Sequence, residues 1–181
     1  MEAINRALAR KQGYSPSFLE KETSPCIFLL HHGAVRKAAE AISDYITQRG
    51  QVDIYWNLSR TADSAAPDEP FLQLFAEGLA LSSHAMILSP PNSSYYRCLT
   101  PLFEHLQKIS MPSSFLLLKD HSPLTIPASL EMLDGIKSLN EYLMRISPEK
   151  NEIIFNNPEY NGLLAHTAPH HPLDGYLNWK G

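Results

Sequence analysis

One loop of the chain concentrates side chains that could bind an anion. It runs from Ser89 to Ser94 and reads Ser-Pro-Pro-Asn-Ser-Ser, between an apolar run and a segment of helical periodicity. Hydroxyl groups, the Asn92 amide and backbone N–H groups just before a helix are donors that hold phosphate oxygens in proteins. The same side chains could equally satisfy the backbone of an ordinary turn. The sequence therefore predicts either a phosphate-binding loop or a polar turn.

Two adjacent histidines, His31 and His32, follow another apolar run and precede Gly33. Histidine gains and loses a proton near neutral pH, so it can serve as an acid, a base or a ligand. A histidine at the end of a strand is nevertheless more often packed or hydrogen-bonded than chemically active. We expect one of the two rings to face the ligand-binding edge of the fold.

The remaining histidines and the cysteines do not indicate a metal site. His166, His170 and His171 lie among prolines without a matching cysteine or acid, and Cys26 and Cys98 have neither metal-ligand spacing nor a disulfide framework. We therefore predict no bound metal.

Strands and helices that could position these side chains alternate along the chain. Apolar runs of strand length predict four strands, and apolar stripes at a spacing of three or four residues predict helices between them. The predicted strands are Cys26–Leu30, Val52–Trp56, His84–Ser89 and Ser114–Leu118. The predicted helical stripes are Val35–Ile46, Phe71–Leu79, Leu99–Ile109 and Leu130–Leu143. We expect Thr100 and Pro101 to begin the third helix, as N-cap and first helical residue.

This alternation is typical of a parallel sheet with helices on both faces. The predicted fold class is α/β, flavodoxin-like, with four to five strands. Ligands of such sheets bind outside the carboxyl ends of the strands. Four segments lie at those ends, namely His31–Gly33, Trp56–Arg60, Ser89–Ser94 and Lys119–Ser122.

Length and composition fit one globular domain. The chain has 181 residues, of which 44% are hydrophobic and 19% are charged. We expect a polar N-terminal arm over residues 1–24, the α/β domain over 25–147, and an irregular extension packed on it over 148–181. The polar loop Asn57–Pro70 is unusually long for a compact domain, which suggests a functional role.

Charge and hydropathy argue against nucleic acid and membranes as partners. Lys and Arg total 15 against 19 Asp and Glu, so the net charge is −4, and no basic cluster is visible. No apolar run approaches the ~18 residues that span a bilayer, and the polar N-terminus lacks the apolar region of a signal peptide. We therefore expect a cytoplasmic protein. The chain has no Gly-x-Gly-x-x-Gly, P-loop or Gly-x-Ser-x-Gly motif, which disfavours Rossmann dehydrogenases, P-loop NTPases and α/β-hydrolases.

The stretch Glu77–Cys98 resembles the central part of a Toll/interleukin-1 receptor (TIR) domain of the bacterial type. Gly78-Leu79 and Ser82 at a helix end, followed by a strand that closes in Leu88-Ser89-Pro90, carry the resemblance. TIR-like features extend less specifically over residues 25–146. The resemblance implies a flavodoxin-like fold and one of two roles, because TIR domains either hydrolyse NAD or act as signalling adaptors.

A glutamate largely separates these two roles in the family, and this chain departs from the pattern there. In catalytic TIR domains it lies about a dozen residues after the Leu-Ser-Pro serine, where this chain has Thr100-Pro101. Glu104 follows one helical turn later and is the only carboxylate between Glu77 and Asp120. A carboxylate near the ribose would stabilise the oxocarbenium charge that develops as nicotinamide leaves. The resemblance therefore makes Glu104 the candidate catalytic residue.

The first hypothesis is a TIR-like protein of bacterial antiviral defence that cleaves NAD or a related nucleotide at the nicotinamide–ribose bond, or makes an ADP-ribose-derived signal. NAD would be its substrate, and no cofactor is expected. Tyr55 and Trp56 would stack on the rings of the nucleotide. The expected substrate-binding residues are His31, His32, Gly33, Tyr55, Trp56, Ser89, Asn92, Ser94 and Tyr96.

Two other hypotheses remain open. The first is a non-catalytic TIR-like adaptor that assembles with itself or with a partner protein through Asn57–Pro70. The second is a nucleoside deoxyribosyltransferase-like enzyme, which shares the fold class and also relies on a glutamate in a nucleoside cleft. The Leu-Ser-Pro loop fits a TIR domain better, so this second alternative ranks last.

Overall fold

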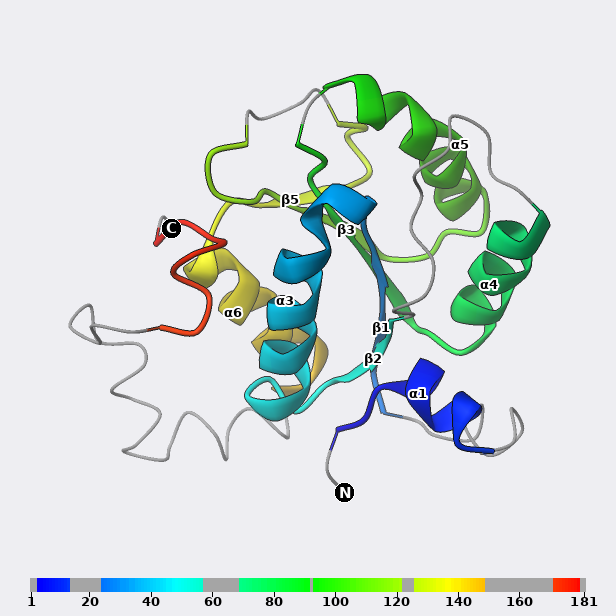
Figure 1. Ribbon diagram of the computed structural model, residues 1–181, viewed down its shortest axis with the longest axis horizontal. Coiled ribbons are helices and arrows are strands. Elements are labelled where there is room, and N and C mark those ends of the chain that lie inside the picture. The colour runs from blue at the N-terminus through cyan, green and yellow to red at the C-terminus, as the bar shows by residue number, and fades with distance from the viewer. Residues whose placement is uncertain are drawn as a thin grey trace.

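A computed structural model of the protein describes residues 3–13, 24–56, 69–91, 93–121, 126–148 and 171–179. In this part of the chain, five parallel strands form one sheet in the order β2-β1-β3-β4-β5 (Figure 1). The strands are β1 (Cys26–Leu30), β2 (Asp53–Tyr55), β3 (His84–Leu88), β4 (Ser113–Leu116) and β5 (Glu131–Leu133). The predicted α/β, flavodoxin-like fold class is confirmed.

Helices cover both faces of the sheet (Figure 1). Four of those in the described residues pack on it, namely α3 (Arg36–Gln48), α4 (Glu69–Ala80), α5 (Ser93–Lys108) and α6 (Ile136–Ile146). Helices α3 and α6 share one core with Ile27 and Leu29 of β1, whereas α4 and α5 share a second core with Phe28. Because side chains alternate between the two covered faces, all five residues of β1 are buried.

The segment after residue 126 differs from the predicted single helix. Residues Glu131–Leu133 form β5, which pairs with β4, and α6 begins only at Ile136. The apolar spacing of Leu130, Leu133 and Ile136 does fit a helix. A three-residue strand is too short to show its own periodicity, so its pairing with β4 decides the conformation.

Helix α5 begins earlier than predicted. Its first residue is Ser93, so Pro101 lies in the helix interior and the expected start at Thr100 is wrong. Proline lacks the N–H that would bond to the carbonyl of Arg97, which is why it suggested a helix start. The helix nevertheless continues through Pro101, since Leu99 and Leu102 on either side are both buried in the core.

The N-terminal arm closes the β2 edge of the sheet. The Ile54 N–H donates to the Ile4 carbonyl at 3.0 Å, and Asn5 pairs in parallel with Ile54. The short helix α1 (Arg6–Lys11) follows and packs beside α4 (Figure 1). An edge strand that is covered in this way cannot pair with another chain.

A C-terminal segment, residues 171–179, packs against the core shared by α3 and α6. Leu173 and Leu177 are completely or almost completely buried there. The Lys119 N–H donates to the Tyr176 carbonyl at 2.7 Å, and the Ile136 N–H donates to the Asn178 carbonyl at 2.8 Å. This C-terminal segment therefore holds the turn after β4 and the start of α6.

Candidate functional site

The candidate site is the carboxyl edge of β1 and β3, which are neighbours inside the sheet. The chain leaves β1 toward α3 on one face, and it leaves β3 toward α5 on the other face (Figure 1). Connections that diverge between neighbouring parallel strands open a crevice, which is where ligands bind in doubly wound sheets. The residues after β1 and β3 are therefore the first to test for chemistry.

Both histidines after β1 are buried, and local bonds fix their rings. The His31 Nδ1 lies 2.9 Å from the His32 carbonyl oxygen, which only accepts, so this nitrogen carries the proton. The His32 Nδ1 accepts the Ala34 N–H at 3.1 Å and caps the short helix η1 (Gly33–Val35). The proton of the neutral ring is therefore on Nδ1 in His31 and on Nε2 in His32.

Trp56 lies beside this pair at the end of β2. Its ring centroid is 6.1 Å from that of His31, and its backbone N–H and carbonyl both bond to the Asn5 side chain. The side chain is buried, and its indole N–H has no hydrogen-bond partner among the described residues. An unpaired buried donor is unfavourable by about 1–3 kcal/mol, so this N–H is suited to bind an acceptor at the edge.

Tyr55 is the last residue of β2, but its side chain is buried and does not offer the expected stacking surface. It is buried on the α4/α5 side of the sheet, where its ring meets Phe28 edge-on at 5.6 Å. Burial raises the pKa of its hydroxyl, and the neighbouring Glu77 raises it further. Side chains alternate along β2, so Tyr55 and Trp56 necessarily project to opposite faces.

Ser89 links the end of β3 to the turn after β4. It is fully buried, and its Oγ accepts the Leu118 N–H at 2.9 Å. The same Oγ lies 2.8 Å from Nδ1 of His121, a half-buried residue that we had not singled out from the sequence. The sequence marks Lys119–Ser122 as a strand end, but only the fold shows that the His121 side chain returns to Ser89 at the end of β3.

Several predicted site residues lie wholly or partly outside the described residues. Asn92 and residues 57–68 of the Asn57–Pro70 loop are among them. For Ser94 and Tyr96 the structure describes the backbone, which forms the first turn of α5. The predicted assembly role of the loop therefore stays a prediction.

Glu104 is exposed on α5, away from the carboxyl edge. It lies eleven residues after Ser93, the first residue of the helix, which corresponds to about 16 Å along the axis. Its neighbours Leu102, Phe103 and Leu106 pack into the core, whereas Glu104 faces solvent. The expectation assumed a helix that starts at Thr100, which would have put Glu104 in the first turn. This placement does not support a catalytic role.

Two cations occupy the N-terminus of α3, directly after the histidine turn. Arg36 and Lys37 are the first residues of this helix, and its first turn holds no acidic residue. Both side chains are exposed, and neither forms an ion pair within the described ranges. The positive end of the helix dipole and these two charges make this part of the edge electropositive.

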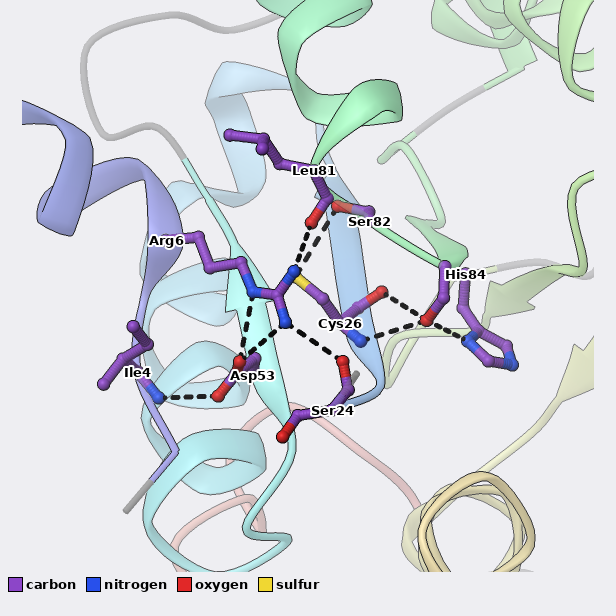
Figure 2. A network of polar contacts seen from close by, with 9 residues as sticks. Ile4, Arg6, Ser24, Cys26, Asp53, Leu81, Ser82 and His84 are labelled. Carbon is purple, nitrogen blue, oxygen red and sulfur yellow. Dashed lines mark hydrogen bonds and ion pairs between the residues drawn. The ribbon is translucent and has the colours of Figure 1, made fainter. Parts of the chain in front are cut away.

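A second polar cluster lies at the opposite, amino edge of the sheet (Figure 2). The Arg6 guanidinium pairs with the Asp53 carboxylate at 2.9 Å, and it donates to the carbonyl oxygens of Ser24 and Leu81. Asp53 also accepts the Ile4 N–H at 3.0 Å. The cluster ties the N-terminal arm to β2 and to the end of α4, so its role is structural.

Cys26 lies within this amino-edge cluster and is chemically quiet. Burial raises the pKa of its thiol to about 12, although the Arg6 charge opposes this shift. Its Sγ lies 3.6 Å from the Ser82 Oγ. The thiolate is the reactive form of cysteine, so a thiol that stays protonated is not a nucleophile.

A hollow of about 430 Å³ lies near the amino end of β4 and is distant from the carboxyl edge. Its walls are Leu106, Met111, Pro112 and Leu130, with Gln107 and three serines at its polar parts. No titratable side chain lines this hollow, so its lining supplies no acid or base for catalysis.

Within the described ranges, no cluster of three or more histidine, cysteine or acidic residues could hold a metal ion. In the same ranges, no helix combines the length and the apolar character needed to cross a bilayer.

Comparison with known proteins adds no assignment. No protein-family model matches the chain, and no curated protein or solved structure is significantly similar to it.

Proposed function

We propose that this chain is a TIR-like signalling module of bacterial defence that binds a nucleotide at the carboxyl edge of β1 and β3, and that it acts by binding rather than by cleaving NAD. The phosphates of the nucleotide would lie against the N-terminus of α3. Its rings and sugar would extend along the ends of β1, β3 and β4.

The observation that carries this proposal is the pair of cations at the start of α3. A helix dipole disfavours positive charge at the N-terminus by about 0.3–1 kcal/mol per residue. Arg36 and Lys37 nevertheless occupy these positions, without a partner carboxylate among the described residues. A phosphate bound there would interact favourably with both side chains and with the helix N-terminus.

Two further features of the edge favour a nucleotide over a bare anion. Trp56 offers a buried indole N–H without a partner in the described part of the chain, next to the His31 ring. Helix α5 also begins at this edge without an acidic residue in its first turn. Hydrogen-bond donors and positive charge together suit a sugar and phosphates.

The position of Glu104 favours binding over cleavage. A ribosyl cation requires a carboxylate close to the sugar, and Glu104 is exposed on the outer face of α5. The described residues between β1 and α3 and between β3 and α5 contain no acid, and Asp120, which follows β4, is exposed. The exposed position of Glu104 also disfavours the deoxyribosyltransferase-like alternative, which relies on a glutamate in the nucleoside cleft.

Titration calorimetry with NAD and with ADP-ribose tests the binding site. We expect the double variant Arg36→Gln, Lys37→Gln to lose tenfold or more in affinity, because about 1.5–3 kcal/mol accompanies each hydrogen bond to a charged group. The variant should also resist unfolding slightly better without ligand, since two unfavourable charges are removed. Lys137→Gln, at the start of α6, is the matched control and should leave affinity unchanged. Equal affinity of both variants would refute the site.

Release of nicotinamide from NAD tests the absence of cleavage. The assay should use high protein concentration, so that activity requiring self-association is not missed. We expect no release above background from the wild-type protein, and the same from Glu104→Gln. Turnover that disappears in Glu104→Gln would reinstate the NAD hydrolase hypothesis.

A further inference from the structure

The turn after β4 places an imidazole against the end of β3. The backbone N–H of His121 donates to the Leu118 carbonyl at 3.2 Å, and this bond closes a tight turn. Asp120 within it has φ of 63°, a left-handed conformation that aspartate tolerates better than most residues. This reversal of the chain returns His121 to Ser89, on the neighbouring strand.

Ser89 determines which ring nitrogen of His121 carries the proton. The His121 Nδ1 lies 3.0 Å from the Ser89 carbonyl oxygen, which can only accept, and 2.8 Å from the Ser89 Oγ. The Oγ also accepts the Leu118 N–H at 2.9 Å. The contact with the carbonyl oxygen requires a donor, which places the proton on Nδ1, and in the neutral ring Nε2 then has the lone pair.

The Nε2 atom is not used by the rest of the described chain. None of the hydrogen bonds among the described residues involves it, and the residue is half-buried. The turn itself is held from outside, because the Lys119 N–H bonds to the Tyr176 carbonyl and the Lys119 Nζ donates to the Asp174 carbonyl. A ring that is oriented through one nitrogen can present the other nitrogen to a ligand.

The location matches the proposed nucleotide site. His121 follows β4, but its ring contacts Ser89 at the end of β3, the neighbour of β1 in the sheet. The ring is therefore between one and two strand spacings from the end of β1, which corresponds to about 5–10 Å. A nucleotide whose phosphates lie at the start of α3 can bridge this distance with its sugar. The sugar would present a hydroxyl group to the lone pair on Nε2 of His121.

We propose that Nε2 of His121 accepts a hydrogen bond from a ribose hydroxyl of the bound nucleotide, with Ser89 as the residue that positions the ring. This inference rests on the proposed function and adds His121 to it as a residue that binds the sugar. It also predicts that the site distinguishes ribonucleotides from analogues without sugar hydroxyls.

A cycle of two proteins and two ligands tests this contact. Calorimetry would compare ADP with its dideoxyribose analogue, on the wild-type protein and on His121→Asn. The asparagine amide can still donate to the Ser89 carbonyl, but it places no acceptor at the Nε2 position. We expect the wild type to prefer ADP about tenfold, as one good hydrogen bond allows, and His121→Asn to show little preference.

His121→Gln serves as the second variant, because its longer side chain can bring an amide oxygen near the Nε2 position. We expect it to recover part of the preference for ADP. Nitrogen chemical shifts of the free wild-type protein should also show the proton of His121 on Nδ1. A proton on Nε2 instead would overturn the inference independently of any ligand.

The outcomes separate this inference from the function on which it rests. If the wild type binds no adenine nucleotide, the proposed function and the His121 contact both fail. If both proteins bind ADP with the same preference over the dideoxyribose analogue, only the His121 contact fails. Thermal melting of each variant checks that the fold is retained.

Discussion

At the scale of single residues, polar side chains of this protein serve the backbone first. His32 caps η1, Ser89 accepts the Leu118 N–H, and Arg6 binds two carbonyl oxygens. A candidate functional side chain is therefore one with a polar atom that forms no hydrogen bond within the protein. At the carboxyl edge, this criterion selects the indole N–H of Trp56 and Nε2 of His121, and it does not select the exposed carboxylate of Glu104.

The buried ion pair between Arg6 and Asp53 gives a prediction at this scale. Arg6→Ala leaves the Asp53 carboxylate buried without its main partner, so we expect a loss of about 3–5 kcal/mol in the free energy of unfolding. Arg10→Ala is the matched control, because the Arg10–Glu77 pair is about one third exposed. We expect that control to cost less than about 1 kcal/mol.

Urea unfolding of the two variants measures this difference. Cooperative transitions with similar slopes would allow their midpoints to be compared directly. Equal losses for Arg6→Ala and Arg10→Ala would show that burial of the first pair contributes nothing.

At the scale of elements, close packing decides positions that propensity alone would assign differently. Helix α5 runs through Pro101 because its apolar stripe is anchored to the sheet on both sides of the proline. Helix α4 carries Gly78, a poor helix former, where it lies against β1. In both helices, tertiary contacts outweigh a local preference of about 1–3 kcal/mol.

Gly78→Ala should destabilise the protein, although alanine is the better helix former. A Cβ at this position would lie 2.6 Å from the Phe28 ring, which is itself held between Tyr55 and Phe75. We expect a loss of about 1–3 kcal/mol from overpacking, measured by urea unfolding.

Two further variants show whether the contact with the Phe28 ring is the cause. Gly78→Ala combined with Phe28→Leu should be less destabilised than the sum of the single changes, since leucine leaves room for the new methyl group. Gly175→Ala, where an added Cβ meets nothing within 4 Å, should be nearly neutral. A stabilised Gly78→Ala protein would contradict the close approach of α4 and β1.

At the scale of the whole molecule, the C-terminal segment completes both the core and the carboxyl edge. Leu173 and Leu177 fill the core between α3 and α6, and Tyr176 holds the turn that carries His121. The conformation of the candidate site thus depends on residues that lie far from it in the sequence. Any change that releases this segment should also loosen the His121 turn.

A buried histidine makes the docking of this segment sensitive to pH. The His171 Nδ1 accepts the Leu173 N–H at 3.1 Å, and the ring packs between Tyr45 and Trp179. Burial lowers the pKa of His171; Arg49 lowers it further, and Asp174 opposes the shift. Protonation would remove the acceptor for the Leu173 N–H and place a charge in the core.

The sign of the effect follows from the direction of the shift. The unfolded chain binds the proton more readily than the docked segment does. The stability contributed by neutral His171 is therefore fully present above the ordinary histidine pKa of about 6.5 and is lost as the pH falls below it. We expect the Lys119 and Ile136 amides, which bond to this segment, to lose hydrogen-exchange protection between about pH 7.5 and 5.5.

His171→Asn separates this residue from other titrating groups. Its side-chain oxygen can still accept the Leu173 N–H, and it does not titrate. Burial also lowers the pKa of His84, and that residue is unchanged in the variant. Protection of Lys119 and Ile136 should then vary less with pH than in the wild type. An identical pH dependence in both proteins would exclude His171 as its origin.

The fold class could be predicted from the sequence because its signals are local. Apolar runs such as Cys26–Leu30 mark doubly covered strands, and amphipathic stripes mark the helices between them. The ends of those strands indicated the edge of the sheet on which His31, Trp56 and Ser89 lie. Local patterns could not identify β5 or the start of α5, because pairing with β4 and packing beside Pro101 decide them.

What the sequence determined by itself is the alternation of strands and helices, and hence the edge at which polar residues collect. Only the tertiary structure decided which of these residues the edge includes. Because side chains alternate along β2, the Tyr55 side chain is buried on the opposite face from Trp56. Because α5 begins at Ser93, Glu104 lies far along the helix from the edge. The turn after β4 brings His121, which the local patterns did not indicate, against Ser89. The physical reason is that facing and reach depend on contacts between distant segments, which no local periodicity encodes.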